Sequence, residues 1–333
     1  MKKMLKGVVA FSLALSFGSA YAETDEVRLD YQNGLTYAPF LFMEKNKTIE
    51  KHAAKLGIKD LKVTFTKMSG PGPINDALIS GAVDAGAVGN PSLSLLHSKT
   101  NGKVKAIASL SYMPMLLNTS NPNVKTIADF TEKDKIALPT VKQSVQAVTL
   151  QMAAAQKFGQ ANYAKLDSYT VSMSHPEAAI QLLGGKSEIN GHFAALPFQN
   201  QELRDGKGKI HTVVNSYDVL GGKTTFVLVA GTTKFATENP KTYQALAASI
   251  EETLKWINEN KTEAAKQYIE LSKSKESLKE VLDQMMSPDV EFNSTPRGIM
   301  KYNEFMAKVG TIKEPAKSWK DLTFPNLHNK SGN

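Results

Sequence analysis

Residues 69–92, SGPGPINDALISGAVDAGAVGNPS, decide the fold, because they contain a complete helix–strand–helix unit. Residues 69–73 break a preceding strand, and residues 74–80 form a short helix that ends at a glycine, as helices commonly do. Residues 83–88 are an apolar strand, and the glycine and proline of 89–91 open the next helix. This stretch therefore predicts one repeat of an α/β sheet.

The same alternation continues on both sides of this unit. We expect strands at residues 27–31 and 61–68 before it and at 104–110 after it, with helical stretches between them. Strands separated by helices are typical of an α/β domain with a largely parallel sheet.

The pattern begins again after a boundary near residues 113–120. The strands and helices expected in this second part are strands at 135–138, 168–173, 188–193 and 211–215, and helices at 144–158 and 176–183. A β-forming segment at 224–230 and a helical C-terminal part follow. Since 333 residues exceed what one hydrophobic core commonly serves, two lobes are expected.

An internal similarity supports two related lobes. Residues 77–84 can be laid over residues 181–188, and both stretches contain the end of a helix, a glycine and an acid before a strand. The same alignment places His192 over Val88, next to the junction at residues 89–90. It therefore predicts His192 at the carboxyl edge of a sheet, where open α/β sheets bind ligands.

Three strand-to-helix junctions could receive an anion. They lie at residues 69–73, 89–92 and 140–144, and each opens a helix whose first N–H groups have no partner within the helix. The short polar side chains at these junctions are Ser69, Asn90, Ser92 and Ser144. The alternative role of each is to cap its helix, which is the common role of serine and asparagine at such positions.

The first 22 residues have the layout of a cleavable signal peptide. Lys2, Lys3 and Lys6 precede an uncharged apolar run, and Ala20-Tyr21-Ala22 is a small-x-small cleavage site before Glu23. The apolar run is shorter than the roughly 20 residues that cross a bilayer, which disfavours a membrane anchor. We therefore expect a mature protein that starts near Glu23 and is exported to a bacterial periplasm.

Composition excludes several classes of function. The chain has no cysteine, which removes disulfides, thiolate metal sites and cysteine nucleophiles. The formal charge of +8 includes the three leader lysines, and the other basic residues are dispersed among acids, so we expect no nucleic-acid partner. The six histidines have no metal-ligand spacing, and neither a nucleophile elbow nor a phosphate-binding loop occurs. We therefore expect no cofactor, no metal, no catalytic residue and a binding function.

In the order and spacing of its motifs, the mature chain resembles the solute-binding components of ABC importers. The resemblance is to the nitrate/sulfonate/taurine-binding branch, which is related to the thiamine-pyrimidine synthases. The stretches that carry it are residues 33–40, Ser69-Gly70-Pro71, residues 77–84, Gly89-Asn90-Pro91, residues 127–130 before the strand at 136–139, Gln143-Ser144, and residues 176–180 with Gly185.

The resemblance implies two α/β lobes of the type II periplasmic binding fold, with a ligand held between them. Residues 113–119 and 224–230 are then the segments that cross between the lobes. Lobe 1 is expected to combine residues 23–115 with 222–333, and lobe 2 to contain residues 116–221. We expect a monomer that closes on a small anion by hinge motion and delivers it to a membrane permease.

The family pattern and the helix starts give nine candidate ligand contacts. They are Tyr37, Ser69, Gly70, Asn90, Ser92, Gln143, Ser144, His192 and Phe193. Where many members have an acid-aromatic segment, this chain has residues 188–198, with a histidine and two phenylalanines. These residue types suit an anion with an apolar or aromatic body, although both also occur as ordinary core residues.

The sequence leaves the ligand open among sulfonates, taurine-like compounds, carboxylates, nitrate and pyrimidines. The closest alternative is a binding protein for a thiamine-pyrimidine precursor. An enzyme of the thiamine-pyrimidine synthase kind is a further alternative, but those enzymes are intracellular and use a cysteine-rich segment, which is absent here.

Overall fold

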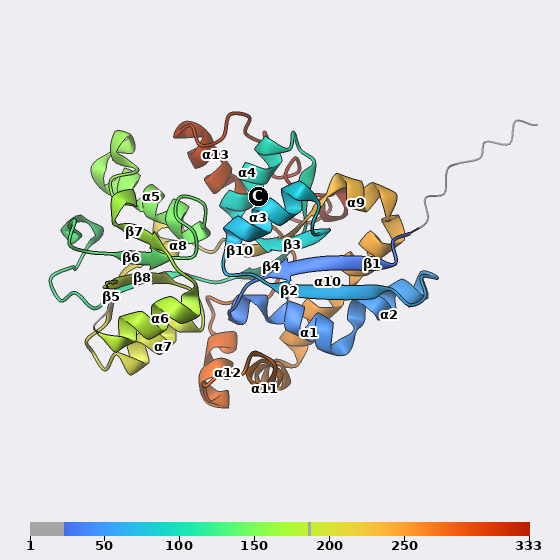
Figure 1. Cartoon of the computed structure of the whole chain (residues 1–333), viewed down its shortest axis with the longest axis horizontal. Coiled ribbons are helices and arrows are strands. Elements are labelled where there is room, and N and C mark those ends of the chain that lie inside the picture. The colour runs from blue at the N-terminus through green and yellow to red at the C-terminus, as the bar shows by residue number, and fades with distance from the viewer. Residues whose placement is uncertain (1–22, 186–187) are drawn as a thin grey trace, which may run out of the picture.

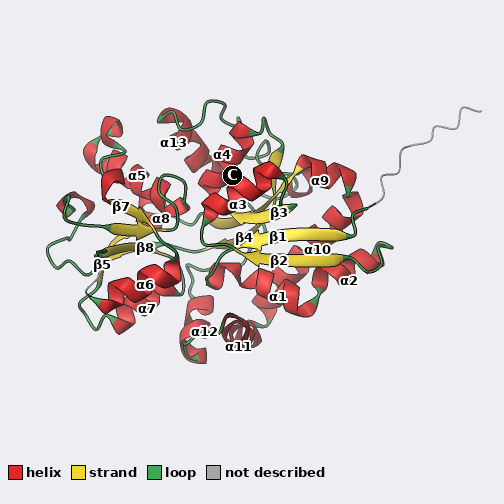
Figure 2. Cartoon of the chain, viewed as in Figure 1, coloured by secondary structure: helices red, strands yellow, loops and turns green. Residues whose placement is uncertain are grey.

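The computed structural model describes residues 23–185 and 188–333. The predicted leader, residues 1–22, lies outside the described residues. Two five-stranded sheets, each flanked by helices, lie side by side along the long axis of the molecule (Figures 1 and 2). The expected two-lobed α/β architecture is confirmed.

The first sheet has the strand order β2-β1-β3-β10-β4. Its strands are β1 (Glu26–Tyr31), β2 (Lys62–Lys67), β3 (Ala85–Val88), β4 (Val104–Tyr112) and β10 (Thr225–Thr232). β1, β2 and β3 are parallel, and β10 lies antiparallel between β3 and β4. The sheet thus mixes parallel strands with one antiparallel strand that returns from the second lobe.

The second sheet has the order β7-β6-β8-β5-β9. Its strands are β5 (Leu116–Thr119), β6 (Ile136–Leu138), β7 (Thr170–Ser172), β8 (Gly191–Ala194) and β9 (His211–Asn215). β6, β7 and β8 are parallel, and β5 runs antiparallel between β8 and β9. β5 therefore has the place that β10 has in the first sheet.

Helices cover both faces of each sheet (Figure 2). Those that belong with the first sheet are η1 (Leu35–Tyr37), α1 (Ala38–Asn46), α2 (Thr48–Lys55), α3 (Pro71–Ser80), α4 (Asn90–Lys99), α9 (Thr233–Glu238), α10 (Pro240–Glu259), α11 (Lys261–Ser272), α12 (Leu278–Met286), α13 (Ile299–Lys308) and η5 (Pro325–Leu327). Those of the second are η2 (Ile127–Asp129), α5 (Val145–Phe158), η3 (Gln160–Asn162), η4 (Asp167–Tyr169), α6 (His175–Gly184), α7 (Phe198–Asp205) and α8 (Ser216–Leu220). No helix of the described ranges is long and apolar enough to cross a membrane.

Local sequence signals fix the ends of the helices at the centre of the fold. α3 has proline in its first turn and ends at Gly81, whose φ of 74° is the left-handed conformation that glycine adopts without strain. α6 repeats both features, with Pro176 in its first turn and Gly185 at its end. α5 starts at Ser144, whose side chain accepts a hydrogen bond from the Ala147 N–H at 3.2 Å.

The prediction for the crossing segments is wrong in part. Most of residues 224–230 belongs to β10, inside the first sheet, and residues 116–119 form β5, inside the second. The chain passes between the sheets at residues 113–115 and again after α8, at residues 221–224. The end of the first passage lies beside the start of α8, because Met115 and Ser216 exchange hydrogen bonds at 2.8 and 2.9 Å. The predicted lobe limits, 23–115 with 222–333 and 116–221, stay a prediction.

The alignment that placed His192 over Val88 is also wrong, by two residues. The helices α3 and α6 correspond as expected, but the connection from Gly185 to β8 is two residues longer than that from Gly81 to β3. In the sheet registers His192 faces Ala137 of β6 as Gly86 faces Asp30 of β1. His192 is thus inside the second sheet and not at its carboxyl edge.

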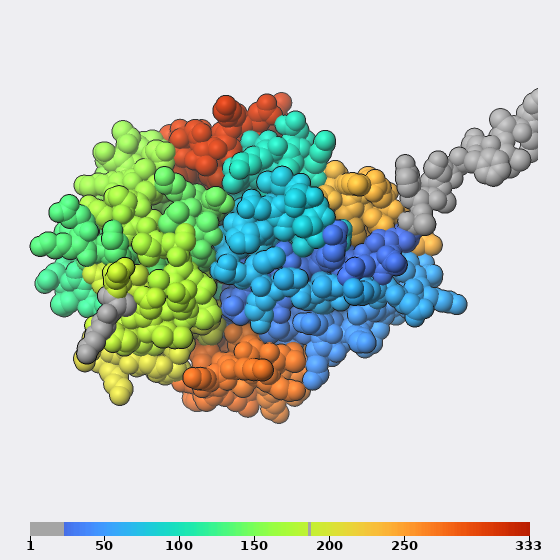
Figure 3. Space-filling view, in the orientation of Figure 1, coloured from blue at the N-terminus to red at the C-terminus, as the bar shows by residue number. Residues whose placement is uncertain are grey.

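The C-terminal helices flank the contact between the lobes. Figure 3 shows α12 (orange) and α13 (red) at opposite ends of the line where the two lobes meet. On the α13 side, the Thr149 and Tyr302 hydroxyls lie 2.9 Å apart and are buried. On the α12 side, Arg204 of α7 pairs with Glu280 at 2.6 Å. α12 and α13, which follow the last strand of the first sheet in the chain, therefore contact helices of the second lobe.

Candidate functional site

A small buried cavity lies between the lobes, where the starts of four helices meet. Its volume is about 10 Å³, room for roughly one water molecule. The lining residues are Gln32, Tyr37, Pro71, Gly89, Ser92 and Phe226 from the first lobe and Pro139, Ser144, Val145, Gln146 and His175 from the second. Both lobes therefore contribute to one closed site.

Each helix start at the cavity leaves backbone N–H groups without a partner within the helix. α3, α4 and α6 have no side-chain cap, and each has proline in its first turn. Their first N–H groups and the positive ends of their dipoles favour negative charge in the space that they face. α5 adds a fourth start, capped by Ser144. The arrangement suits an anion bound by dipoles and N–H donors.

The side chains that line the cavity are uncharged. Burial raises the pKa of Tyr37 and lowers the pKa of His175 well below its usual range, so both are neutral near pH 7. His192 is the second cause of the lowered His175 pKa. The remaining polar groups of the lining are the amides of Gln32 and Gln146 and the hydroxyls of Ser92 and Ser144.

A chain of hydrogen bonds leads from the cavity into the second lobe. Gln146 Nε2 lies 3.1 Å from His175 Nε2, and His175 Nδ1 lies 2.8 Å from His192 Nε2. His192 Nδ1 in turn contacts Glu202 Oε1 of α7. The side chains of His192 and Glu202 are completely buried. His175 is therefore the cavity's link to an acidic group deep in the lobe.

The far end of this chain is also satisfied. Asn118 of β5 donates to Glu202 Oε2 at 2.9 Å and to the Gln199 carbonyl oxygen at 3.0 Å. Thr212 of β9 donates to Asn118 Oδ1 at 2.8 Å. The His175 ring stacks on Phe198, with the ring centroids 5.8 Å apart. Strands and helices of the second lobe thus fix every member of the chain.

Of the nine predicted contact residues, Tyr37, Ser92 and Ser144 line the cavity. Gly70, the N-cap of α3, lies against the second lobe beside it. Their roles in binding stay predictions, since the geometry places them at the site and no ligand tests them.

The other five lie outside the lining. Asn90 is buried at the start of α4 and donates to the Thr225 carbonyl oxygen at 2.7 Å. Ser69 is exposed and Gln143 is half-buried. His192 has both ring nitrogens occupied by His175 and Glu202, and Phe193 packs in the apolar core on the opposite side of β8.

Four residues of the lining were not predicted from the sequence: His175, Gln146, Gln32 and Phe226. His175 had a usable signal, because Ser174-His175-Pro176 opens a helix after a strand in the same manner as the three junctions predicted to receive an anion. The other three have no motif, since they reach the cavity only through the packing of the two sheets.

Two glycines let the lobes approach each other at the cavity. A Cβ at Gly89 would lie 2.0 Å from Val145 Cγ2, and a Cβ at Gly70 would lie 2.8 Å from the Pro139 carbonyl oxygen. Neither distance is compatible with a side chain while the lobes are closed. Glycine at these two positions therefore allows the lobes to approach as closely as they do in this structure.

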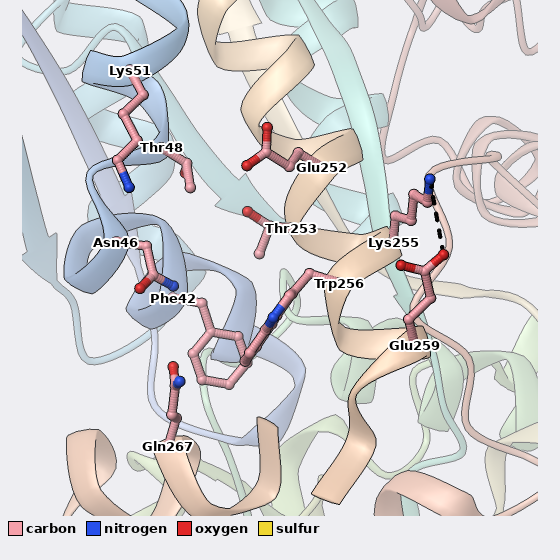
Figure 4. A pocket seen from close by; sticks show the side chains of 10 residues that line it. All are labelled: Phe42, Asn46, Thr48, Lys51, Glu252, Thr253, Lys255, Trp256, Glu259 and Gln267. Carbon is pink, nitrogen blue, oxygen red and sulfur yellow. Dashed lines mark ion pairs between the residues drawn. The ribbon is translucent and has the colours of Figure 1, made fainter. Parts of the chain in front are cut away.

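A larger groove lies on the first lobe alone, between α1, α2, α10 and α11 (Figure 4). Its volume is about 460 Å³, and the edge-to-face pair of Phe42 and Trp256 forms part of its wall. Charged side chains of both signs surround it, and Lys255 and Glu259 pair at 3.9 Å. Because one lobe supplies every lining residue, closure of the lobes does not reshape this groove.

Among the described residues, no group of three or more acidic or histidine side chains could hold a metal ion.

No curated protein matches the chain. Solved structures match its fold. The alkanesulfonate-binding protein SsuA from Xanthomonas axonopodis pv. citri, bound to MOPS, is 15% identical, with a TM-score of 0.64, 88% of this chain covered and 96% of that chain.

Two further structures show the same likeness. The aliphatic sulphonate-binding protein SsuA from Escherichia coli has a TM-score of 0.65 at 13% identity, covering 92% of this chain and 99% of that one. The nitrate-binding protein NrtA from Synechocystis PCC 6803 has a TM-score of 0.66 at 16% identity, covering 90% and 84%. The fold is thus that of periplasmic binding proteins, as the sequence resemblance predicted. The profile of the NMT1-like family matches residues 20–272, and the chain belongs to that family.

Proposed function

We propose that this protein is the solute-binding component of an ABC importer and captures a small organic anion between its lobes. The observation that carries the proposal is the meeting of four helix starts from both lobes at one cavity without a charged side chain. Such a site stabilises negative charge only when both lobes surround it. Structures of sulfonate- and nitrate-binding proteins share the fold, which supports this ligand class.

Ligand binding requires that the lobes separate and close again. The cavity of about 10 Å³ is far too small for an alkanesulfonate, and its lining residues are buried. Rotation about the two passages at residues 113–115 and 221–224 would open it, as in hinge closure of periplasmic binding proteins. Val145, Pro139 and Phe226 would then contact the apolar body of the ligand.

Delivery to a permease in the inner membrane completes the proposal. Residues 1–22 have the layout of a signal peptide, which supports export to the periplasm. We propose that the exported protein is a monomer. We further propose that the protein is not an enzyme, because the two serines of the lining, Ser92 and Ser144, are hydrogen-bonded to Asn75 and to the Ala147 N–H in the described structure and not to His175.

A thiamine-pyrimidine precursor is the second candidate ligand. The observation in its favour is the same uncharged lining, because two amides, a phenol and a neutral imidazole can also bind a neutral heteroaromatic ring. The two ligand classes differ in charge, so they can be separated by experiment.

The test is a thermal-shift and calorimetric screen of the mature protein. Ethanesulfonate, taurine, nitrate, a carboxylate and an aminopyrimidine are compared in amine buffers, which avoids competing buffer anions. A ligand at 100 times its dissociation constant should add about 2.7 kcal/mol of stability. Binding of an anion supports the proposal, and binding of only the neutral pyrimidine would favour the second candidate. A set of flat curves would refute both.

A further inference from the structure

We infer that Glu202 and His192 set the charge of ligand that the cleft accepts, by coupling anion binding to the uptake of one proton. The inference rests on the proposed function, since it needs an anion in the cavity. Its basis is the unbroken chain of contacts from Gln146 through His175 and His192 to Glu202.

The hydrogen-bond directions of the unliganded chain follow from its ends. An ionised Glu202 only accepts, so His192 Nδ1 must carry a proton toward it. At the other end the Gln146 amide nitrogen donates, so His175 Nε2 must be an acceptor. His175 Nδ1 then holds the second proton and donates to His192 Nε2 at 2.8 Å. This state has two ring protons and one net negative charge.

In this two-proton state the Gln146 N–H is directed at His175 Nε2, so the amide offers its carbonyl oxygen to a ligand in the cavity. An anion would meet that acceptor, which repels it, with an uncompensated carboxylate at the far end of the chain. A ligand that donates a hydrogen bond would be favoured instead. The unliganded chain therefore discriminates against the ligand class that the helix starts attract.

One added proton reverses the direction of the chain. The proton on His175 Nδ1 crosses to His192 Nε2, and a proton from solvent occupies His175 Nε2. His192 is then an imidazolium between Glu202 and His175, and His175 stays neutral and donates from Nε2 to Gln146, whose amide turns to accept with its carbonyl oxygen. The chain has gained one proton and is neutral overall, so an anion in the cavity now meets the Gln146 N–H groups, which are donors.

The surroundings of the chain favour this placement of the charge. Burial and the neighbouring His192 lower the pKa of His175, which disfavours a positive charge on that ring, and His192 is the ring that contacts the Glu202 carboxylate. The groups that pack on the chain from other elements are neutral: Gln146 of α5, Asn118 of β5, Ala137 of β6 and Phe198 of α7. The nearby charged residues of α6 and α7, Glu177, Arg204 and Asp205, are exposed.

The experiment measures proton uptake during titration with ethanesulfonate, whose charge does not change across the pH range used. In unbuffered solution at pH 7, a pH-stat should record close to one proton taken up per anion bound. By linkage, the dissociation constant should rise up to about tenfold for each unit of pH above neutrality. Uptake near zero with a flat pH profile would overturn the inference and leave the proposed function standing. Absence of ethanesulfonate binding would overturn both.

A variant localises the effect. Glu202→Gln keeps the shape of the side chain but removes the charge that holds the imidazolium. It should lose the proton uptake and the pH dependence, and bind ethanesulfonate about ten- to a hundredfold more weakly. The matched control is Glu177→Gln, which removes a negative charge from the exposed face of α6 and should behave as wild type. A Glu202→Gln protein that still takes up one proton would place the titrating group elsewhere.

Discussion

In the first lobe β3 carries Gly86 beneath α3, and in the second lobe β8 carries His192 at the equivalent register beneath α6. The sheets have the same strand order and both supply uncapped helix starts to the cleft. A Cβ at Gly86 would already lie 2.8 Å from Ile74, whereas the space at His192 holds an imidazole and two polar partners. Both lobes thus supply helix starts that favour an anion, and the second lobe adds a hydrogen-bonded chain of titratable side chains.

The largest effect is expected from removing the side chain that distinguishes the lobes. His192→Ala leaves the Glu202 carboxylate buried without its ring partner, which should cost about 3–5 kcal/mol of unfolding free energy. Gly86→Ala, at the matched position, only overpacks α3 and should cost about 1–3 kcal/mol. Urea denaturation of both variants tests this order. Equal losses of unfolding free energy in the two variants would mean that the buried His192–Glu202 pair stabilises the protein only through the volume that it fills.

The second effect concerns closure instead of folding. Gly70→Ala forces a Cβ against the Pro139 carbonyl oxygen at 2.8 Å, so the lobes cannot close fully. Ligand affinity should fall by about tenfold to a hundredfold, roughly 1.4–2.8 kcal/mol, while the unfolding free energy changes little. Small-angle scattering should show that the variant stays extended in the presence of ligand.

The matched control for closure is Gly72→Ala. It adds the same methyl group two residues along, where the nearest atom, Thr140 Cγ2, lies at an ordinary 3.5 Å. It should bind as wild type. Similar losses in both variants would assign the effect to α3 and not to contact between the lobes.

A third effect is a pH dependence that belongs to the second lobe. The pKa of His175 is lowered in the folded protein, while in the unfolded chain a histidine titrates near 6.5. Below that pH the unfolded chain binds more protons than the folded protein, so the unfolding free energy falls as pH drops. The contribution of His175 to stability is fully present above about pH 7. The slope from this group is at most about 1.4 kcal/mol per pH unit. Denaturation midpoints between pH 5 and 8, with His175→Gln as the comparison, should show the slope shrink in the variant.

The comparison also shows how far sequence reasoning extends. Proline and glycine at helix ends predicted α3, α4 and α6 well, because these residues act locally. The two extra residues between Gly185 and β8 shifted His192 into the sheet, since connection length is not visible in a helix-end motif. His192 of β8 and Glu202 of α7 meet only because the helix packs on the strand, so no spacing in the sequence predicted their contact.

The smallest effect lies at the rim of the contact between the lobes, where two sides can be compared. On the α12 side Arg204 and Glu280 pair at 2.6 Å, but Arg204 is exposed and also pairs with Asp205 of its own helix at 2.7 Å. Since Arg204 has a partner in either arrangement of the lobes, the gain on closure is small, about 0.2–1 kcal/mol. Arg204→Ala should therefore weaken ligand binding by less than about fivefold, and added salt should abolish the difference.

On the α13 side the buried Thr149 hydroxyl donates to the Val145 carbonyl oxygen of its own helix at 2.7 Å and so accepts from the Tyr302 phenol. Among the described residues that phenol has no second hydrogen-bond partner. Thr149→Val removes one partner and leaves the phenol buried, which should cost about 1–3 kcal/mol and stay insensitive to salt. A double-mutant cycle of Arg204→Ala with Glu280→Gln, read out as ligand affinity at low and high salt, measures the rim pair directly. A coupling energy above about 2 kcal/mol that survives high salt would show that the α12 side, and not the buried α13 side, holds the lobes closed.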